Sequence, residues 1–221
     1  MLFSDRYLFI HAPKTAGMSV TKFLMDNTPD PVTLTVPPGH AASSPKLTVI
    51  AGKRHERLSE AVEMLATLGR KLEDFETIIS IMRNPYDLEV SYYHYKRLGH
   101  PWDKGKAQDL ALAGDFAEFA RKAPYNGRNP ARIEDWYEID GKQPANLQIL
   151  RFENLETELN DLVGRMHPVA RKLEKKNFTK HAPFMSYVTP EAERAIFRKY
   201  RWIFDNNFYP RATVAADARS G

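Results

Sequence analysis

The stretch YLFIHAPKTAGMSV, residues 7–20, decides the fold class of this chain. Its first four residues are apolar and are soon followed by Pro, Lys and Gly, which is typical of a short buried strand that ends in a turn. Beyond Gly17, the apolar residues Val20, Phe23 and Leu24 recur at helical spacing. The sequence therefore predicts a strand, a short loop and a helix, in that order.

The loop between this strand and this helix, residues 11–19, is typical of an anion site. Backbone N–H groups at a helix start point toward a ligand, and the helix dipole favours negative charge there. Gly17 allows close approach of the backbone, Ser19 adds a hydroxyl and Lys14 adds a positive charge. A Walker A loop has Gly-Lys-Ser/Thr, whereas Lys14 precedes the glycine here, so the loop predicts phosphate binding without a metal. The alternative is a strand–turn–helix with an incidental surface lysine.

A second motif, SIMRNPYDLEVSYYHY at residues 80–95, begins within another predicted buried strand, at residues 77–82, and Arg83 directly follows that strand. Asn84 and Pro85 favour a helix start, and the helix is predicted to reach Arg97. Arg83 offers a planar fork that matches a phosphate, and Ser91 lies eight residues later on the helix. Two anion sites at the carboxyl ends of strands indicate a nucleotide phosphorylated at two places. Alternatively, Arg83 pairs with a carboxylate and Ser91 is a surface residue.

Strands and helices alternate along the rest of the chain. Strands are predicted at residues 32–36, 47–51 and 147–152, and helices at 56–72, 115–122, 155–166 and 190–203, with irregular segments at 98–114 and 125–140. This alternation predicts a single α/β domain over residues 1–209, with a central, mostly parallel β-sheet flanked by helices and a P-loop-like strand–loop–helix. The small polar residues 210–221 are expected to form a disordered tail.

The composition is that of an ordinary globular protein. The chain has 221 residues, 43% of them hydrophobic and 27% charged, and a formal net charge of +4, which is modest for a nucleic-acid binder. It has no cysteine, which excludes disulfides and thiolate catalysis. No apolar window is long enough to span a membrane, and no secretory signal is visible, so a cytoplasmic protein is expected.

The two motifs together resemble the sulfotransferases that use 3′-phosphoadenosine 5′-phosphosulfate (PAPS). PKTAGMS is similar to their 5′-phosphosulfate loop, and MRNPYDLEVSYYHY is similar to their 3′-phosphate motif. ILRFENLETEL and YVTPEAERAIFRKYRWIFDNNFY resemble the branch that contains bacterial carbohydrate-type enzymes and heparan sulfate 2-O-sulfotransferase. The resemblance implies transfer of a sulfuryl group to an acceptor hydroxyl, with adenosine 3′,5′-bisphosphate as the product and no metal.

The resemblance also implies a role for each matching residue. The 5′-phosphosulfate would be held by the loop residues Lys14, Thr15, Ala16, Gly17, Met18 and Ser19, and Lys14 would stabilise charge on the bridging oxygen. Arg83 and Ser91 would hold the 3′-phosphate. Two departures stand out, since Met18 replaces a common Thr and Leu88 replaces a common second Arg.

Residues 165–201 are rich in Lys and Arg, and Lys176, Asn177 and Lys180 are candidates for a loop over the 3′-phosphate. The alternative is a solvated helical face. The stretch is also expected to attract an anionic acceptor.

Transfer to a hydroxyl needs a general base, and histidine has a suitable pKa. His55 is the candidate, because it follows a predicted strand and precedes a helix, and related sequences tend to place a Lys-His or Gly-His pair there; its alternative is a surface histidine in a basic cluster. His11 is the second candidate, and weaker ones are His94, His100 and Glu153.

The acceptor is expected to be a carbohydrate, with a lipid or a small metabolite as alternatives. Four aromatic residues in or near irregular segments either stack on it or pack in the core: Tyr95, Trp102, Tyr125 and Trp136. The competing functions are a Mg²⁺-dependent kinase and a non-catalytic nucleotide- or glycan-binding relative.

Overall fold

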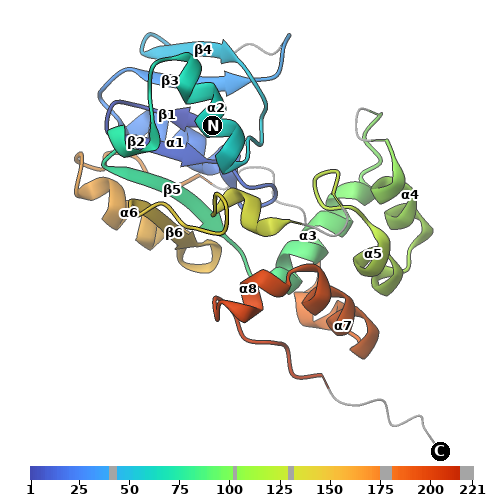
Figure 1. Cartoon of the computed structure of the whole chain (residues 1–221). Coiled ribbons are helices and arrows are strands. Elements are labelled where there is room, and N and C mark those ends of the chain that lie inside the picture. The colour runs from blue at the N-terminus through green and yellow to red at the C-terminus, as the bar shows by residue number, and fades with distance from the viewer. Residues whose placement is uncertain (40–43, 102–103, 129–131, 175–180, 215–221) are drawn as a thin grey trace, which may run out of the picture. The chain divides into compact units, whose positions relative to one another are not determined.

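The computed structural model describes residues 1–39, 44–101, 104–128, 132–174 and 181–214. The chain divides into two compact units, which are described separately (Figure 1). The first consists of Met1–Arg83 and Asp135–Asn177, and the second of Asn84–Glu134 and Phe178–Gly221. The first unit carries the loop at residues 11–19, and the second carries the helix with Ser91.

A six-stranded sheet forms the centre of the first unit, in the order β4-β3-β1-β2-β5-β6. Its strands are β1 (Leu2–Phe3), β2 (Tyr7–Ile10), β3 (Val32–Val36), β4 (Leu47–Ala51), β5 (Thr77–Met82) and β6 (Leu147–Arg151). β2 with β5, β5 with β6, and β3 with β4 are parallel pairs, and only β1 runs antiparallel to its neighbours. The predicted mostly parallel α/β sheet is therefore confirmed.

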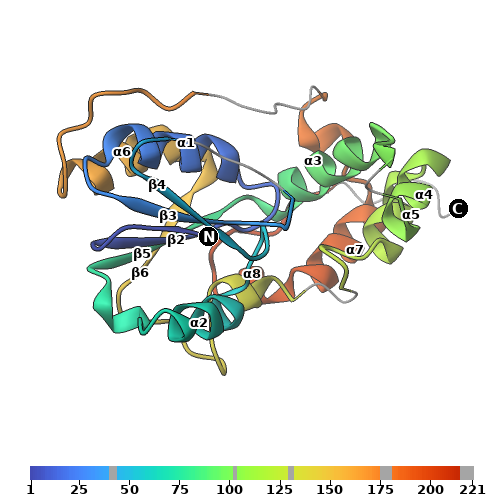
Figure 2. The same cartoon turned by 90° about the horizontal axis from the view of Figure 1, so that it is seen from above.

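Helices cover both faces of this sheet (Figure 2). On one face lie α1 (Gly17–Asn27) and α6 (Leu155–Gly164), and on the other lies α2 (Leu58–Thr67). Short 3-10 helices occur at Leu72–Asp74, Ile133–Trp136 and Phe152–Asn154. Phe9, Phe23 and Ile79 belong to the buried core under α1 and α6, as the apolar spacing of the first motif predicts.

The second unit is helical. It contains α3 (Pro85–Arg97), α4 (Lys106–Ala113), α5 (Phe116–Lys122), a 3-10 turn at Phe184–Tyr187, α7 (Pro190–Lys199) and α8 (Arg201–Asp205). The Asn84 side chain accepts a hydrogen bond from the Tyr86 N–H at 2.9 Å and so caps α3, as predicted.

A buried polar group lies on α3 in this unit. The Glu89 carboxylate is fully buried, and it accepts hydrogen bonds from Lys199 Nζ at 2.7 Å and from Tyr200 Oη at 2.5 Å. Burial, together with the charge of Glu89, raises the pKa of Tyr200 well above its usual value. The two helices α3 and α7 are thus tied by a paired charge that their sequences alone did not indicate.

The structure corrects three element boundaries. Residues 106–113 form α4 where an irregular segment was expected, because Ala107 and Ala111 bury one face while Gly105 and Gly114 bound the helix. The predicted helix over residues 56–72 ends at Thr67. The last predicted helix divides at Tyr200, whose φ of −114° departs from helical geometry.

The C-terminal segment is described as far as residue 214. Arg211 there pairs with Glu193 at 2.8 Å and lies 4.0 Å over the Phe197 ring. The boundary of the expected disordered tail at residue 210 stays a prediction.

Candidate functional site

The loop after β2 has an unusual backbone. Lys14 and Ala16 both adopt φ of 62°, in the left-handed region, although neither is a glycine. Such conformations cost on the order of 1–3 kcal/mol each and persist only where the surroundings enforce them. Left-handed residues that alternate with ordinary ones turn successive N–H groups toward a common point, which is the geometry of an anion-binding nest.

The start of α1 follows this nest directly. Ala16 is the N-cap residue, and it supplies no side-chain hydrogen bond to the first turn. The first turn also lacks an acidic side chain. The positive end of the helix dipole is therefore not neutralised by a cap within this helix, which favours a bound anion.

Two side chains hold the loop in this shape. Thr15 Oγ1 is buried and donates a hydrogen bond to the Ala12 carbonyl at 2.8 Å. Arg83 Nη1 donates to the Lys14 carbonyl at 3.0 Å. The hydroxyl of Thr15 thus braces the loop, so any contact of this residue with a ligand falls to its backbone N–H.

Arg83 is itself held by an aromatic residue that the sequence did not single out. Its guanidinium carbon lies 4.1 Å from the centre of the Phe152 ring, and the residue is buried. Phe152 follows β6 directly, and β6 pairs with β5, which ends just before Arg83. The sheet therefore brings the ends of β2, β5 and β6 together, and only the strand order could have indicated Phe152.

His55 lies against the backbone of the first motif. Its Nδ1 is 3.1 Å from the His11 carbonyl oxygen. Because a carbonyl only accepts, Nδ1 must carry the hydrogen, so the neutral ring has Nε2 free of a proton and able to accept one. Burial lowers the pKa of His55 to about 4, while the bond to His11 opposes this shift.

His11 is buried beneath the loop. Its ring centroid is 4.3 Å from that of His55 in an edge-to-face contact and 6.0 Å from that of Phe9 in a stacked one. Burial, followed by the neighbouring His55, lowers the pKa of His11 well below its usual value. A β-carbon added at Gly17 would lie 1.7 Å from the His11 ring.

Other predicted site residues belong to the second unit. Ser91 is buried on α3, and Leu88 is buried in the core of that unit. His94 Nε2 contacts Tyr187 Oη at 2.9 Å, and its ring stacks on that of His181. Met18, in the first unit, is 47% exposed at the start of α1, so its side chain leaves the loop.

The remaining residues predicted for the site lie in the core, at the surface or outside the described residues. Tyr125 and Trp136 are fully buried, so they pack in the core rather than stack on an acceptor. Tyr95 and His100 are half-buried, and Glu153 is exposed. Four predicted residues lie outside the described residues: Trp102, Lys176, Asn177 and Lys180.

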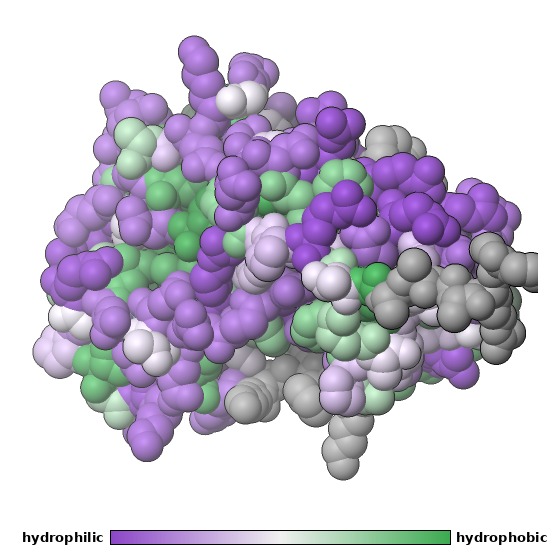
Figure 3. Space-filling view, turned by 90° about the horizontal axis from the view of Figure 1, so that it is seen from below, coloured by the Kyte–Doolittle hydropathy of each residue, from purple (hydrophilic) through white to green (hydrophobic). Residues whose placement is uncertain are grey.

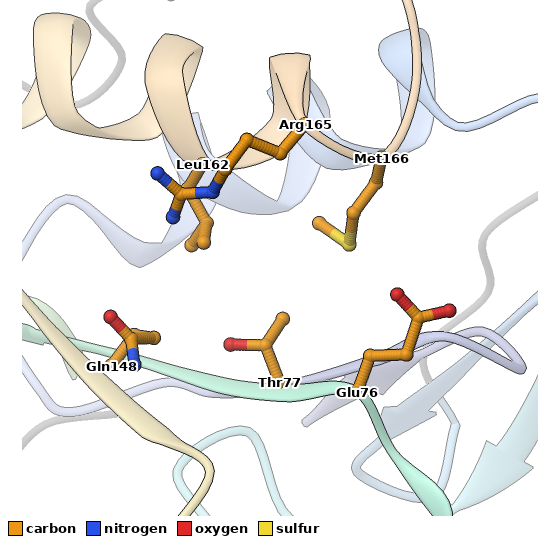
Figure 4. Close-up of a pocket in the computed structure, with 6 residues that line it drawn as sticks. All are labelled: Glu76, Thr77, Gln148, Leu162, Arg165 and Met166. Atoms are coloured by element: carbon orange, nitrogen blue, oxygen red, sulfur yellow. The ribbon is translucent and has the colours of Figure 1, made fainter.

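A cavity of about 230 Å³ lies elsewhere on the first unit (Figure 4). Thr77 begins β5 and Gln148 lies near the start of β6, so the cavity is at the opposite end of these parallel strands from the loop after β2. Glu76 and Arg165 also line it, so its lining carries one charge of each sign. This cavity is therefore not the predicted phosphate site.

In the view of Figure 3, hydrophilic residues predominate, with groups of apolar residues between them. Exposed large apolar side chains come from separate segments: Met18, Leu68, Leu98, Leu112, Val169 and Met185. Within the described residues, no helix is both long and apolar enough to cross a membrane.

The parallel sheet and the uncapped helix start behind a left-handed loop define an α/β enzyme that handles a phosphorylated ligand. The model of one family, described as the sulfotransferase domain, matches residues 69–195, and by this match over more than half of its length the chain belongs to the sulfotransferase family. The match confirms the predicted enzyme class, a PAPS-dependent sulfotransferase. It includes Arg83 and Ser91, while the loop at 11–19 and His55 precede it.

Among solved structures, the fold is similar to that of mouse sulfotransferase SULT7A1, whose crystal structure is a complex with PAP. The TM-score is 0.56 at 15% sequence identity, and the alignment covers 92% of this chain and 86% of the mouse chain. This likeness confirms the fold. No curated protein matches the sequence.

Proposed function

We propose that the loop at residues 11–19 binds the 5′-phosphosulfate of PAPS and that His55 is the general base for transfer to an acceptor hydroxyl. The observation that carries the proposal is the left-handed backbone at Lys14 and Ala16, directly before an uncapped helix. Strained backbone conformations of this kind cluster at functional sites, where the surrounding structure enforces them. Anions are the ligands that a nest at a helix start favours.

PAPS, when bound, supplies the sulfuryl group and its 5′-phosphate leaving group. Backbone N–H groups of the loop would hold the 5′-phosphate, and the Lys14 ammonium would stabilise the negative charge of the departing phosphate as the sulfuryl group passes to the acceptor. His55 Nε2 takes the proton of the attacking hydroxyl, since Nδ1 is committed to the His11 carbonyl. The low pKa of His55 keeps its ring neutral at pH 7, so Nε2 carries no proton there.

Arg83 and Ser91 are proposed to hold the 3′-phosphate, with Lys180 as a further contact. Arg83 Nη1 donates to the Lys14 carbonyl, and the planar guanidinium has the geometry that matches a phosphate. Stacking on Phe152 fixes the plane of these donors. The Arg83 side chain would thus connect the loop at residues 11–19 with the proposed 3′-phosphate subsite.

Calorimetric titration with adenosine 3′,5′-bisphosphate, with and without Mg²⁺, tests the nucleotide site. We expect binding that does not depend on Mg²⁺. Binding of ATP that requires Mg²⁺, with no binding of the bisphosphate, would favour a kinase instead. Absence of all nucleotide binding would refute the proposal, and binding without turnover of any acceptor would indicate a non-catalytic relative.

For the acceptor, we propose a carbohydrate hydroxyl in a cytoplasmic setting. The support is the resemblance of residues 149–159 and 187–209 to the carbohydrate branch of the family, together with the basic stretch at 165–201, which suits an anionic glycan. A screen of sugars, lipids and small metabolites with ³⁵S-labelled PAPS tests this choice. Transfer to lipids or metabolites alone would refute the carbohydrate assignment while leaving the sulfotransferase reaction intact.

A further inference from the structure

We propose that His11 is a positioning residue that joins the phosphate loop to the base: its ring fills the space beside Gly17, and its backbone carbonyl holds His55. In this arrangement the glycine at position 17 is required by the His11 ring, not by the nucleotide. The proposal rests on the proposed function for its catalytic half, whereas its packing half concerns the protein alone.

The backbone of Gly17 gives no reason of its own for a glycine. Gly17 is the first residue of α1, and its φ is not among the positive values of the described chain. The strained, left-handed positions of this loop are Lys14 and Ala16, which carry side chains. An alanine in a helix is favoured over glycine by about 1 kcal/mol. On backbone grounds alone, position 17 should therefore accept alanine.

The His11 ring supplies the reason that the backbone lacks. The three atoms nearest to a β-carbon at position 17 all belong to this ring, at 1.7, 1.8 and 2.3 Å. These distances are far below van der Waals contact, so one of the two groups would have to move. A glycine at 17 thus lets the ring lie directly on the backbone of the first helical turn.

The ring has little freedom to move away. His11 is 9% exposed, and it lies between Phe9 on β2 and His55, with which it makes the stacked and edge-to-face contacts described above. Phe9 is itself completely buried in the core under α1. A side chain at 17 would therefore displace the ring into a packed region or push the helix start away from it.

The same residue also reaches the base. The His11 carbonyl accepts the hydrogen bond of His55 Nδ1, and the His11 ring shields the His55 ring from water. A shift of His11 would consequently move both the helix start that meets the phosphate and the histidine that takes the proton. This coupling is a reason for the sequence to place a histidine at the end of β2.

The test compares Gly17→Ala, His11→Ala and the double variant Gly17→Ala/His11→Ala with the wild type. A loop displaced by the added methyl group must return to its original shape to hold the nucleotide, so the overpacking cost of about 1–3 kcal/mol falls on binding. We therefore expect Gly17→Ala to weaken adenosine 3′,5′-bisphosphate binding by roughly 5- to 150-fold. The double variant should bind within about threefold of His11→Ala, because the added methyl group then has space. The proposal would be overturned if Gly17→Ala weakened binding as much in the His11→Ala background as it does in the wild type.

Gly164→Ala is the matched control. Gly164 ends α6 in the same unit, and a β-carbon there meets nothing within 4 Å. We expect this variant to keep the melting temperature and the affinity of the wild type. The melting temperatures of all five proteins are also measured without nucleotide. Gly17→Ala should lower the melting temperature in the wild type but much less in the His11→Ala background, and this comparison tests the packing even if the wild type binds no nucleotide. No rescue in melting temperature would overturn the packing half, and failure of the wild type to bind would count against the proposed function alone.

The pH dependence of turnover tests the link to His55. The groups that act on the pKa of His55 are the His11 backbone carbonyl, Arg54, Glu56 and the ammonium of Met1, and His11→Ala keeps all four. Loss of the His11 ring opens His55 to water, so the acid limb of kcat/KM should move upward, toward the usual histidine range near 6.5. A variant that merely loosened the loop would lower the rate at every pH, and an unmoved limb would overturn this half of the proposal.

Discussion

The buried state of His55 makes a quantitative prediction about stability in acid. Burial lowers the pKa of His55 to about 4 in the folded chain, whereas the unfolded chain has the ordinary value of 6.5. Above pH 6.5 the ring is neutral in both states, so it contributes no pH dependence. Between pH 6.5 and 4 the unfolded chain takes up a proton that the folded chain refuses, so stability must fall as the pH falls. Below pH 4 both states are protonated and the loss is complete.

The size of this loss follows from the two pKa values. A difference of about 2.5 pH units, at about 1.36 kcal/mol per unit, amounts to about 3 kcal/mol of lost unfolding free energy. The pH dependence of the wild type alone is that of the whole chain. The comparison therefore has to be made with His55→Asn, which lacks this one titration and keeps the rest.

Urea unfolding at pH 4 to 8 measures the effect. Of the three tryptophans, Trp136 alone belongs to the first unit, and it is fully buried. Trp102→Phe and Trp202→Phe, made in both proteins, turn its fluorescence into a report on that unit. The free-energy difference between the two proteins should be flat above pH 6.5 and change by about 3 kcal/mol by pH 4. Parallel curves for the two proteins would refute the buried, neutral His55.

Three further predictions concern Lys14 in the loop, the Phe152 ring that packs on Arg83, and the buried ion pair of the second unit. Lys14→Ala should cut turnover by on the order of 10²–10³, by analogy with the loss of one transition-state donor, while bisphosphate affinity falls less; unchanged turnover would remove Lys14 from its role. Phe152→Leu should weaken bisphosphate binding by roughly 2- to 30-fold, because Arg83 loses a cation–π contact worth about 0.5–2 kcal/mol, and equal affinity in calorimetry would show that Arg83 needs no aromatic support. Lys199→Met should destabilise the second unit by about 3–5 kcal/mol, because it leaves Glu89 buried without its cation. The double variant Glu89→Gln/Lys199→Met should recover part of this loss in urea unfolding followed through the fluorescence of Trp202. A Lys199→Met variant as stable as the wild type would contradict the buried pair.

The sequence predicted the order of elements well where the local pattern was strong. The buried runs at Tyr7–Ile10 and Thr77–Met82 and the capped helix starting at Pro85 all lie where expected. It was wrong at α4, because the polar residues and glycines of the segment at 98–114 favoured an irregular structure, whereas the helix itself is rich in Ala and Leu. β1 went unpredicted because two residues are too few to carry a pattern.

The candidate site was predictable in its charges but not in its internal contacts. Lys14 and Arg83 were named from their residue types and spacing, because phosphates need cations and backbone donors near helix starts. The reach of Arg83 to the Lys14 carbonyl depends on β2 and β5 lying side by side, with Arg83 directly after β5. Phe152 enters only because β6 is the next strand in the sheet.

The loop at residues 11–19 separates most clearly what the sequence determined from what the tertiary structure decided. The sequence by itself determined that a strand, a short loop with Lys14 and a helix follow one another, and that an anion would suit the loop. Only the tertiary structure decided which residues carry the left-handed backbone, what the His11 ring fills beside Gly17 and which nitrogen of His55 is free to take a proton. The physical reason is that residue type and spacing set local conformation and charge, whereas burial and hydrogen-bond partners depend on segments that the fold brings from distant parts of the chain.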